Sequence, residues 1–520
     1  MEQVFMYHPE NAIVETESGK VRGYSWNGIS IFKGIPYAKA KRFHAPQPVE
    51  RWEGVFDATS YGYVCPLLDV SQRPNGELLV PHRYWIMNED CQNLNIWTPG
   101  LEQSKLPVLV WLHGGGFEAG SAIEQVAYEG ESMCREGNVV VVSINHRLNV
   151  LGYCDLSPFG EQYANSGNAG TDDIIAALRW VRDNIANFGG DPDNVTVFGQ
   201  SGGGAKVTTL LQTPAADGLY AKGINMSGVA GGLLADGTGS GEELARAMMK
   251  ELELNDVSGL ETVPYAMLAQ AYQKVRWALA KEGFYVGGTP YKNEFYIGSP
   301  SEQGFRKETS QIPMLVGTVY GEFTSFMPTP YNKSVLTAAQ GEEIVRQRIG
   351  KEAADELLPL YKKAYPERNP VDLLNLDFIF RLPTIQYIKQ RSALNQCTYS
   401  YLFNQDMPVN HGRTPWHCAD IPYVFHNTNL IPSTQETGVT EKLEKQIFDS
   451  VIAFARTGNP NHAALPEWQP STPQKEQTMV FDKQTGQRVN YDKELIPLVA
   501  KYMGAIFAKG MEENKDSVQH

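Results

Sequence analysis

A serine set between glycines carries the strongest chemical signal in this sequence. Ser201 is the centre of the Gly-Gln-Ser-Gly-Gly segment at 199–203, which follows the apolar run at 195–198. A G-x-S-x-G pattern between a strand and a helix is typical of a nucleophile elbow, a tight turn that exposes the serine hydroxyl above a sheet. A free hydroxyl is a weak nucleophile, so this chemistry also requires a base, an orienting acid and an oxyanion site.

A second glycine-rich segment predicts the oxyanion site. His-Gly-Gly-Gly at 113–116 follows the apolar run at 107–112. Successive glycines leave backbone N–H groups unshielded, so we expect Gly115 and Gly116 to bind an oxyanion together with the N–H of Gly202. A flexible turn is the alternative, but a strand-HGGG segment and a strand-GxSxG segment occur in this chain in the order that elbow-type enzymes use.

The choice of base is limited by the order of residues along the chain, which in elbow-type enzymes runs from serine to acid to histidine. The histidines after the elbow are His411, His417, His426, His462 and His520. His417 has the best context, because it lies in a loop between the strand candidate at 399–403 and the apolar segment at 421–425. Active-site residues are concentrated on such loops, although a loop histidine without a partner remains the alternative.

The acid is less well determined by the residues alone. Glu322 follows the strand candidate at 314–316 and a turn at 317–321, so it also lies beyond a strand end. The chain has 59 acidic residues, most of which are expected to be solvated, and this context leaves other acids open.

The elements that must position these residues predict an α/β fold. Apolar strand candidates alternate with helices, such as the one expected over 171–187, and this order indicates a mostly parallel sheet with helices on both faces. We expect one domain over 1–520. Two helical insertions at about 239–283 and 338–394 would cap the active-site end, with a small separate domain as the alternative reading. The polar tail at about 511–520 is expected to fray.

Composition excludes several partners. The formal net charge of −14 disfavours nucleic acid as a partner, and no apolar run is long enough to span a bilayer.

The start of the chain has no basic segment or apolar core, which favours a cytoplasmic protein; a secreted protein that has lost its leader is the alternative. Six cysteines without a CxxC pair argue against a metal site. No cofactor is expected.

Further motifs give a family resemblance that covers most of the chain. The segments at 32–38, 89–97, 184–192 and 417–425 resemble the signatures of the type B carboxylesterases, which include para-nitrobenzyl esterases and cholinesterases. The resemblance implies an α/β-hydrolase fold, with Ser201 as nucleophile, Glu322 as acid and His417 as base. The sequence departs from the family pattern at Gln200, where Glu is common, and at Gly202, where Ala is common.

The acid segment departs too, because the family usually has Asp and Gly where this chain has Gly321 and Phe323. The resemblance also implies a disulfide between Cys65 and Cys91, which the expected reducing compartment argues against. Aromatic residues beside the motifs are candidates for the substrate pocket or for ordinary core packing: Phe117, Phe323, Phe326 and Trp416.

The expected activity is hydrolysis of carboxylic esters of small to medium alcohols through an acyl-enzyme, without metal or cofactor. The alternatives are a non-catalytic binding module and a serine hydrolase that acts on lipid esters, thioesters, carbamates or amides. We expect a monomer or small homo-oligomer whose partner is a small ester.

Overall fold

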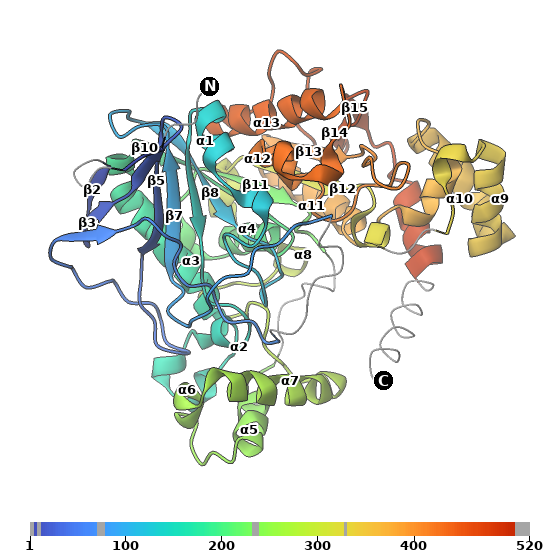
Figure 1. The fold of residues 1–520 in the computed structure, drawn as a ribbon. Coiled ribbons are helices and arrows are strands. Elements are labelled where there is room, and N and C mark those ends of the chain that lie inside the picture. The colour runs from blue at the N-terminus through green and yellow to red at the C-terminus, as the bar shows by residue number, and fades with distance from the viewer. Residues whose placement is uncertain (1–4, 8–11, 70–78, 231–238, 327–329, 505–520) are drawn as a thin grey trace.

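A central twisted sheet organises the chain (Figure 1). The structure, a computed structural model, describes residues 5–7, 12–69, 79–230, 239–326 and 330–504; the predicted tail at 511–520 lies outside these ranges. Within them, one sheet has 12 strands. In spatial order they are β1 (Phe5–Met6), β4 (Tyr24–Trp26), β5 (Ile29–Pro36), β7 (Asn93–Thr98), β9 (Val140–Ile144), β8 (Leu106–Leu112), β10 (Gly190–Gln200), β11 (Lys222–Met226), β12 (Met314–Val319), β13 (Thr398–Phe403), β14 (Gln477–Phe481) and β15 (Gly486–Val489).

The sheet is parallel from β9 through β14, and antiparallel pairs flank this block at both edges. The strand candidates at 107–112, 314–316 and 399–403 all fall within strands, which confirms them. A hairpin turn at Asn27 joins β4 to β5. A smaller sheet contains β2 (Ile13–Thr16), β3 (Gly19–Arg22) and β6 (Val55–Asp57).

The central strands are apolar on both sides because each face is covered. In β8, Val108 and Val110 enter one hydrophobic cluster, while Leu109 and Trp111 enter another on the opposite face. This alternation explains why the strand reads in the sequence as a continuous apolar run. A strand with both faces buried is held firmly, so the loops at its carboxyl end start from fixed positions.

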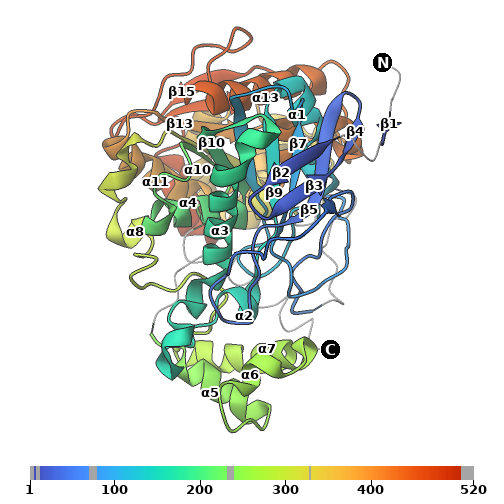
Figure 2. The same ribbon diagram turned by 90° about the vertical axis from the view of Figure 1, so that its left-hand side faces the viewer.

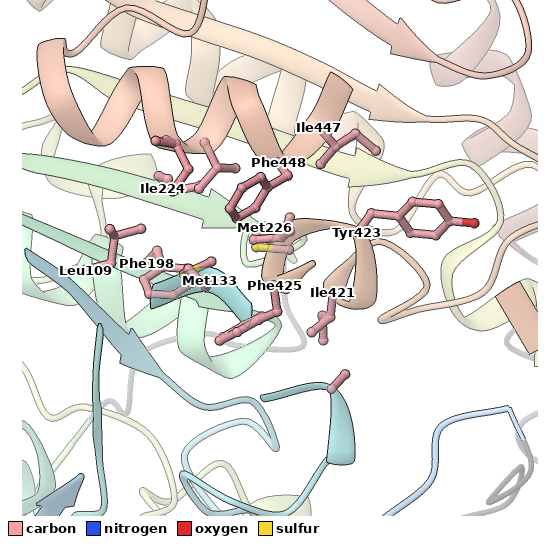
Figure 3. Packing of buried hydrophobic residues seen from close by; sticks show 14 of the residues in the cluster. Leu109, Met133, Phe198, Ile224, Met226, Ile421, Tyr423, Phe425, Ile447 and Phe448 are labelled. Carbon is pink, nitrogen blue, oxygen red and sulfur yellow. The ribbon is translucent and has the colours of Figure 1, made fainter. Parts of the chain in front are cut away.

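One face is covered by α3 (Ala169–Asn184), α4 (Gly202–Leu211) and α11 (Arg381–Leu394). The other is covered by α1 (Glu131–Gly137), α12 (Ile421–Phe425) and α13 (Thr440–Thr457). Figure 3 shows this second core, where Phe198 and Ile224 of the sheet lie near Phe425 of α12 and Phe448 of α13. The predicted helix at 171–187 corresponds to α3 and the short 3₁₀ helix that continues it.

Helices are found in both regions that were expected to contain insertions. The first contains α5 (Glu242–Glu251), α6 (Gly259–Thr262) and α7 (Tyr265–Lys281), which lie together below the body of the molecule in both views (Figure 2). The second contains α9 (Ala338–Ile349), α10 (Lys351–Ala364) and the whole of α11. Two further short α-helices lie in the described ranges, α2 (Asn149–Gly152) and α8 (Pro300–Gln303). In the described ranges we find no helix that is both long enough and apolar enough to cross a bilayer.

Candidate active site

The predicted elbow is a sharp turn from β10 into α4. Ser201 has φ 58° and ψ −125°, a strained conformation for a residue with a side chain. Its N–H donates to the Met226 carbonyl at 2.8 Å. Close packing holds the turn: a Cβ added at Gly199 would lie 2.4 Å from the backbone of Gly203, and one added at Gly203 would lie 1.9 Å from the Leu112 carbonyl oxygen. Both glycines are therefore required for this approach of strand, turn and helix.

The loop after β8 brings its glycines against the elbow. Gly115 and Gly116 have positive φ angles of 84° and 64°, which glycine adopts readily. Within the described residues, their N–H groups donate to no backbone carbonyl. Gly202 is the first residue of α4, so its N–H also lacks a partner inside the helix. A Cβ added at Gly202 would lie 2.4 Å from the Gly116 nitrogen, which shows how closely these predicted donors approach.

Glu322 and His417 form a buried pair. Nδ1 of His417 is hydrogen-bonded to Oε2 of Glu322, and the His417 backbone N–H donates to the Glu322 carbonyl at 3.1 Å. The other carboxylate oxygen, Oε1, accepts from the Ser227 hydroxyl at 2.6 Å and from the Val319 N–H at 2.7 Å. The Glu322 side chain is fully buried, so these donors replace its hydration. Ser227 was not anticipated, because a serine after a strand has no distinctive sequence signal.

The imidazole of His417 lies against the residue that precedes the serine. Nε2 of Gln200 is 3.2 Å from Nε2 of His417, and Oε1 of Gln200 accepts from Cys418 Sγ at 3.2 Å. When Nδ1 carries the proton that bonds Glu322, Nε2 is the ring's acceptor and accepts from the Gln200 amide. Glu322 and His417 are therefore brought together beside the elbow, with Nε2 of the ring against Gln200, the residue that precedes Ser201.

Two aromatic rings pack against this imidazole and against each other. Phe323 lies 4.4 Å from the His417 ring centroid, and Phe380 stacks on the ring at 4.9 Å and 28°. Phe380 is positioned by Asp377, whose carboxylate accepts from the N–H groups of residues 379–381. Burial raises the pKa of Asp377 to about 8, and Glu322 adds to this shift.

The other aromatic candidates are placed differently. Phe117 is 2% exposed and packs edge-on against Tyr153. Trp416 is 1% exposed within the core beside α12 and α13, and Phe326 packs against the same core. Phe323 remains 38% exposed. Ordinary core packing thus describes Phe117 and Trp416, whereas Phe323 lies open to solvent beside His417.

The implied disulfide is absent from this structure. Cys65 and Cys91 are free and buried thiols. The Leu148 N–H donates to Cys65 Sγ at 3.3 Å, and a hydrogen bond from Cys65 together with burial raises the pKa of Cys91 well above its usual range. The sequence left the Cys65–Cys91 bond open, and in this structure both residues are reduced thiols, with the Leu148 N–H bonded to Cys65 Sγ.

The glycine segment at 113–116 is the predicted oxyanion loop. A cavity of about 820 Å³ lies beside the residues that follow this loop. It is bordered on one side by Glu118 and Ser121, which follow the loop, and on another by Arg276 and Trp277 of α7. Arg276 donates to Glu118 at 2.5 Å, which ties α7 to this loop. Apolar side chains form much of the remaining wall: Val64, Leu67, Leu68, Tyr84, Trp85 and Met87. No group of three metal-ligating side chains was found among the residues that the structure describes.

The parallel block with a serine elbow after β10 and helices on both faces defines an α/β-hydrolase fold. The chain belongs to the carboxylesterase family, whose sequence profile matches residues 10–496. It is 33% identical over 490 residues to the para-nitrobenzyl esterase of Bacillus subtilis, an alignment that covers 91% of this chain and 95% of the relative. It is 31% identical to liver carboxylesterase 1 of Oryctolagus cuniculus, with 88% and 87% of the two chains covered.

Solved structures agree with this assignment. An esterase of Clostridium hathewayi, described as able to hydrolyse aliphatic aromatic polyesters, superposes with a TM-score of 0.93 at 52% identity. That comparison covers 96% of this chain and 100% of the other. A thermophilic para-nitrobenzyl esterase matches with a TM-score of 0.75 at 32% identity, covering 94% and 99%. The protein is a serine carboxylesterase that hydrolyses carboxylic esters, so the alternative of a non-catalytic binding module is set aside.

The packing around the site explains two departures from the family pattern. A Cβ added at Gly321 would lie 1.8 Å from Ser325 Oγ, so the common Asp does not fit there. At Gly202, a Cβ would lie 2.2 Å from the Gly116 carbonyl oxygen, so the common Ala does not fit either. The loop at 114–116 of this chain lies where a side chain at residue 202 would be.

Gly202→Ala is accordingly expected to lower kcat by about 10- to 100-fold, because the new methyl must displace Gly116 while the N–H of residue 202 is retained. Steady-state kinetics on para-nitrophenyl acetate measure this effect. Gly486→Ala is the control, since its added Cβ meets nothing closer than 3.9 Å. A kcat for Gly202→Ala within twofold of wild type would show that the oxyanion loop adapts freely.

Proposed function

We propose that Ser201, His417 and Glu322 form the catalytic triad of this esterase. One observation carries the assignment: the His417 ring bonds the buried Glu322 carboxylate through Nδ1, while its Nε2 faces Gln200, one residue before Ser201. A base must be held by an acid on one nitrogen and reach the nucleophile with the other. The position of Nε2 beside the elbow supports this arrangement.

The reaction proceeds through an acyl-enzyme. As Ser201 Oγ attacks the ester carbonyl carbon, His417 Nε2 takes its proton, and Glu322 stabilises the imidazolium. The negative charge on the carbonyl oxygen is bound by the N–H groups of Gly115, Gly116 and Gly202. The intermediate collapses with release of the alcohol, which receives the proton from His417. Water then attacks the acyl-enzyme with His417 as base, and the carboxylic acid leaves.

The assignment is tested by covalent labelling. We expect diethyl para-nitrophenyl phosphate to transfer one diethylphosphoryl group per chain to Ser201, with release of one para-nitrophenol. Peptide mass spectrometry locates the adduct, and the burst of para-nitrophenol counts it. An adduct on another serine, or no adduct in an active preparation, would contradict the triad.

We propose esters of small to medium alcohols as the first substrate class, in line with the para-nitrobenzyl esterase relatives. Residues 1–520 would act as one hydrolase unit, in which α5 to α7 form an insertion beside the site. The lining of the 820 Å³ cavity by α7 supports this role for the insertion. Esters are thus expected to be turned over faster than amides or thioesters of matched size.

A second candidate substrate is an aliphatic aromatic polyester. The rim of the cavity beside the oxyanion loop exposes large aromatic side chains: Trp277 is 61% exposed, Tyr84 48% and Trp85 41%. Apolar surface in such a patch marks a contact site for an apolar partner. The relative from Clostridium hathewayi, which is described as hydrolysing such polymers, supports the same substrate for this chain.

Trp277→Ala is expected to slow release of soluble aromatic acid from a polyester film by about fivefold, because part of the apolar contact is lost. Activity on para-nitrophenyl acetate should stay within twofold. Met267→Ala is the matched control, since Met267 is 50% exposed on α7 but does not line the cavity. Equal losses in both variants, or none in either, would rule out the aromatic rim as a polymer contact.

A further inference from the structure

A lysine is buried beneath the oxyanion loop. Lys206 lies on α4, five residues after Ser201, and is 1% exposed. Its ammonium donates to the His113 carbonyl at 2.9 Å. His113 is the residue from which the glycine run starts, so the ammonium bonds the peptide two residues before Gly115. Phe117 follows the glycine run in the sequence, and the centroid of its ring lies 6.0 Å from the same nitrogen.

This position is unfavourable for stability. Burial lowers the pKa of Lys206 to about 7, with Glu124 and Cys65 acting in the opposite direction. Burial likewise raises the pKa of Glu124 to about 7, so the carboxylate that would best compensate the ammonium is itself only partly ionised near neutrality. A buried charge that is incompletely paired costs folding free energy, and an apolar side chain of similar volume is often tolerated as well or better. The lysine is thus poorly explained as a stabilising residue.

The contacts of Lys206 indicate instead that its ammonium acts on the oxyanion site. The hydrogen bond to the His113 carbonyl fixes the first peptide of the loop, from which Gly115 and Gly116 follow. A positive charge in a dry environment also favours negative charge that develops close by. The electrostatic effect is stronger in the transition state than in the ground state, because the oxyanion forms only there.

We propose that Lys206 is a positioning residue of the oxyanion loop, which holds the His113 carbonyl and lowers the energy of the oxyanion by the field of its ammonium. The inference rests on the proposed function, since it requires the oxyanion to be bound at Gly115, Gly116 and Gly202. It adds a charged side chain to a site otherwise built from backbone N–H groups.

The proposal carries a pH dependence, whose sign follows from the groups that face Lys206. Burial, and then Lys206 itself, lowers the pKa of both His113 and His146 well below their usual range, so these rings stay neutral. Glu124 gains negative charge as pH rises, which helps to retain the ammonium. The ammonium is present below its pKa of about 7 and is lost above it. We therefore expect kcat to decline on the alkaline side of neutrality.

Lys206→Met tests the charge at nearly constant volume. With para-nitrophenyl acetate between pH 5.5 and 9.5, we expect kcat at pH 6.5 to fall about tenfold with KM within twofold. This loss is smaller than that for a direct oxyanion donor, because Lys206 does not touch the oxyanion. The alkaline decline of kcat should disappear, and the melting temperature should equal or exceed that of wild type. Lys206→Gln, which retains a neutral donor, should lie between the two in kcat and also lack the decline.

The matched control is Lys222→Met. Lys222 is also a buried lysine, but it lies at the start of β11 and bonds Asn194, away from the loops at the carboxyl ends of the strands. This variant should keep wild-type kcat and pH profile. The wild-type profile is a test in itself, independent of whether a variant folds: a kcat that rises up to pH 9.5 overturns the proposal.

Other outcomes are equally decisive. Lys206→Met with kcat within twofold of wild type overturns the inference, as does a variant whose melting temperature falls and whose KM rises with kcat unchanged. Failure of the triad is distinguishable, because it would appear as phosphoryl labelling away from Ser201 whatever the behaviour of the lysine variants.

Discussion

Ser201→Ala is expected to lower kcat on para-nitrophenyl acetate by about a millionfold, a loss of the size seen when the nucleophile of a serine hydrolase is removed. The methyl group cannot form the acyl-enzyme, and only binding and the oxyanion site remain to assist attack by water. The backbone should be unaffected, because the bond from the N–H of residue 201 to the Met226 carbonyl does not involve the side chain.

Stopped-assay kinetics measure this loss. The variant is purified separately from the wild-type enzyme, because traces of wild type would mask the effect. The control is folding: the melting temperature of Ser201→Ala should lie within about 2 °C of wild type, as both side chains bear the strain at φ 58°. The variant should also take up no phosphoryl label. Retention of more than one per cent of kcat would refute Ser201 as nucleophile.

Glu322→Gln is expected to lower kcat by about 10³- to 10⁴-fold, as when the orienting acid of a triad becomes an amide. The reason lies in the contacts of Oε1. This oxygen accepts from the Val319 N–H, a backbone donor that cannot reorient, so the amide oxygen must stay there. The amide nitrogen then faces Nδ1 of His417 and donates to it.

This forces the wrong imidazole tautomer. When Nδ1 accepts from the amide, Nε2 carries the proton and can no longer take one from Ser201. The charge that stabilises the imidazolium is lost as well. Steady-state kinetics measure the effect, and KM should change little, because substrate binding does not involve Glu322.

Asp420→Asn is the matched control for the acid. Asp420 is another buried carboxyl near His417; burial raises its pKa to about 6, and it accepts from the Tyr401 hydroxyl at 2.7 Å. The Asn oxygen can still accept that bond, so we expect a loss of less than tenfold. A larger loss in Asp420→Asn than in Glu322→Gln would transfer the role of acid to Asp420.

Much of the site could be predicted because its chemistry depends on local backbone geometry. The elbow and the oxyanion loop need glycines at set positions beside a buried strand, and these leave a readable pattern around Ser201 and Gly115. His417 and Glu322 were harder, since any loop histidine or acid has the same local appearance. Their choice depended on chain order and on the family motifs around them.

Other residues had no pattern to reveal them. Ser227 and Phe380 come from separate elements and contact Glu322 and His417 only because β11 and the segment before α11 end beside these two residues. The state of Cys65 and Cys91 was left open for the same reason, because it depends on what surrounds the two thiols. Lys206 did leave a signal as the single charged residue of α4, but its hydrogen-bond partner could not be predicted from the sequence.

The sequence by itself determined the fold class and predicted Ser201 as nucleophile and the glycines at 114–116 as its oxyanion loop, because strand periodicity and glycine positions act over a few neighbouring residues. Only the tertiary structure decided which carboxylate holds His417, how Gly116 closes over residue 202, and what the buried ammonium of Lys206 contacts. These depend on distances between segments up to 95 residues apart in the chain. The packing of the sheet and its helices sets such distances, and the local sequence does not.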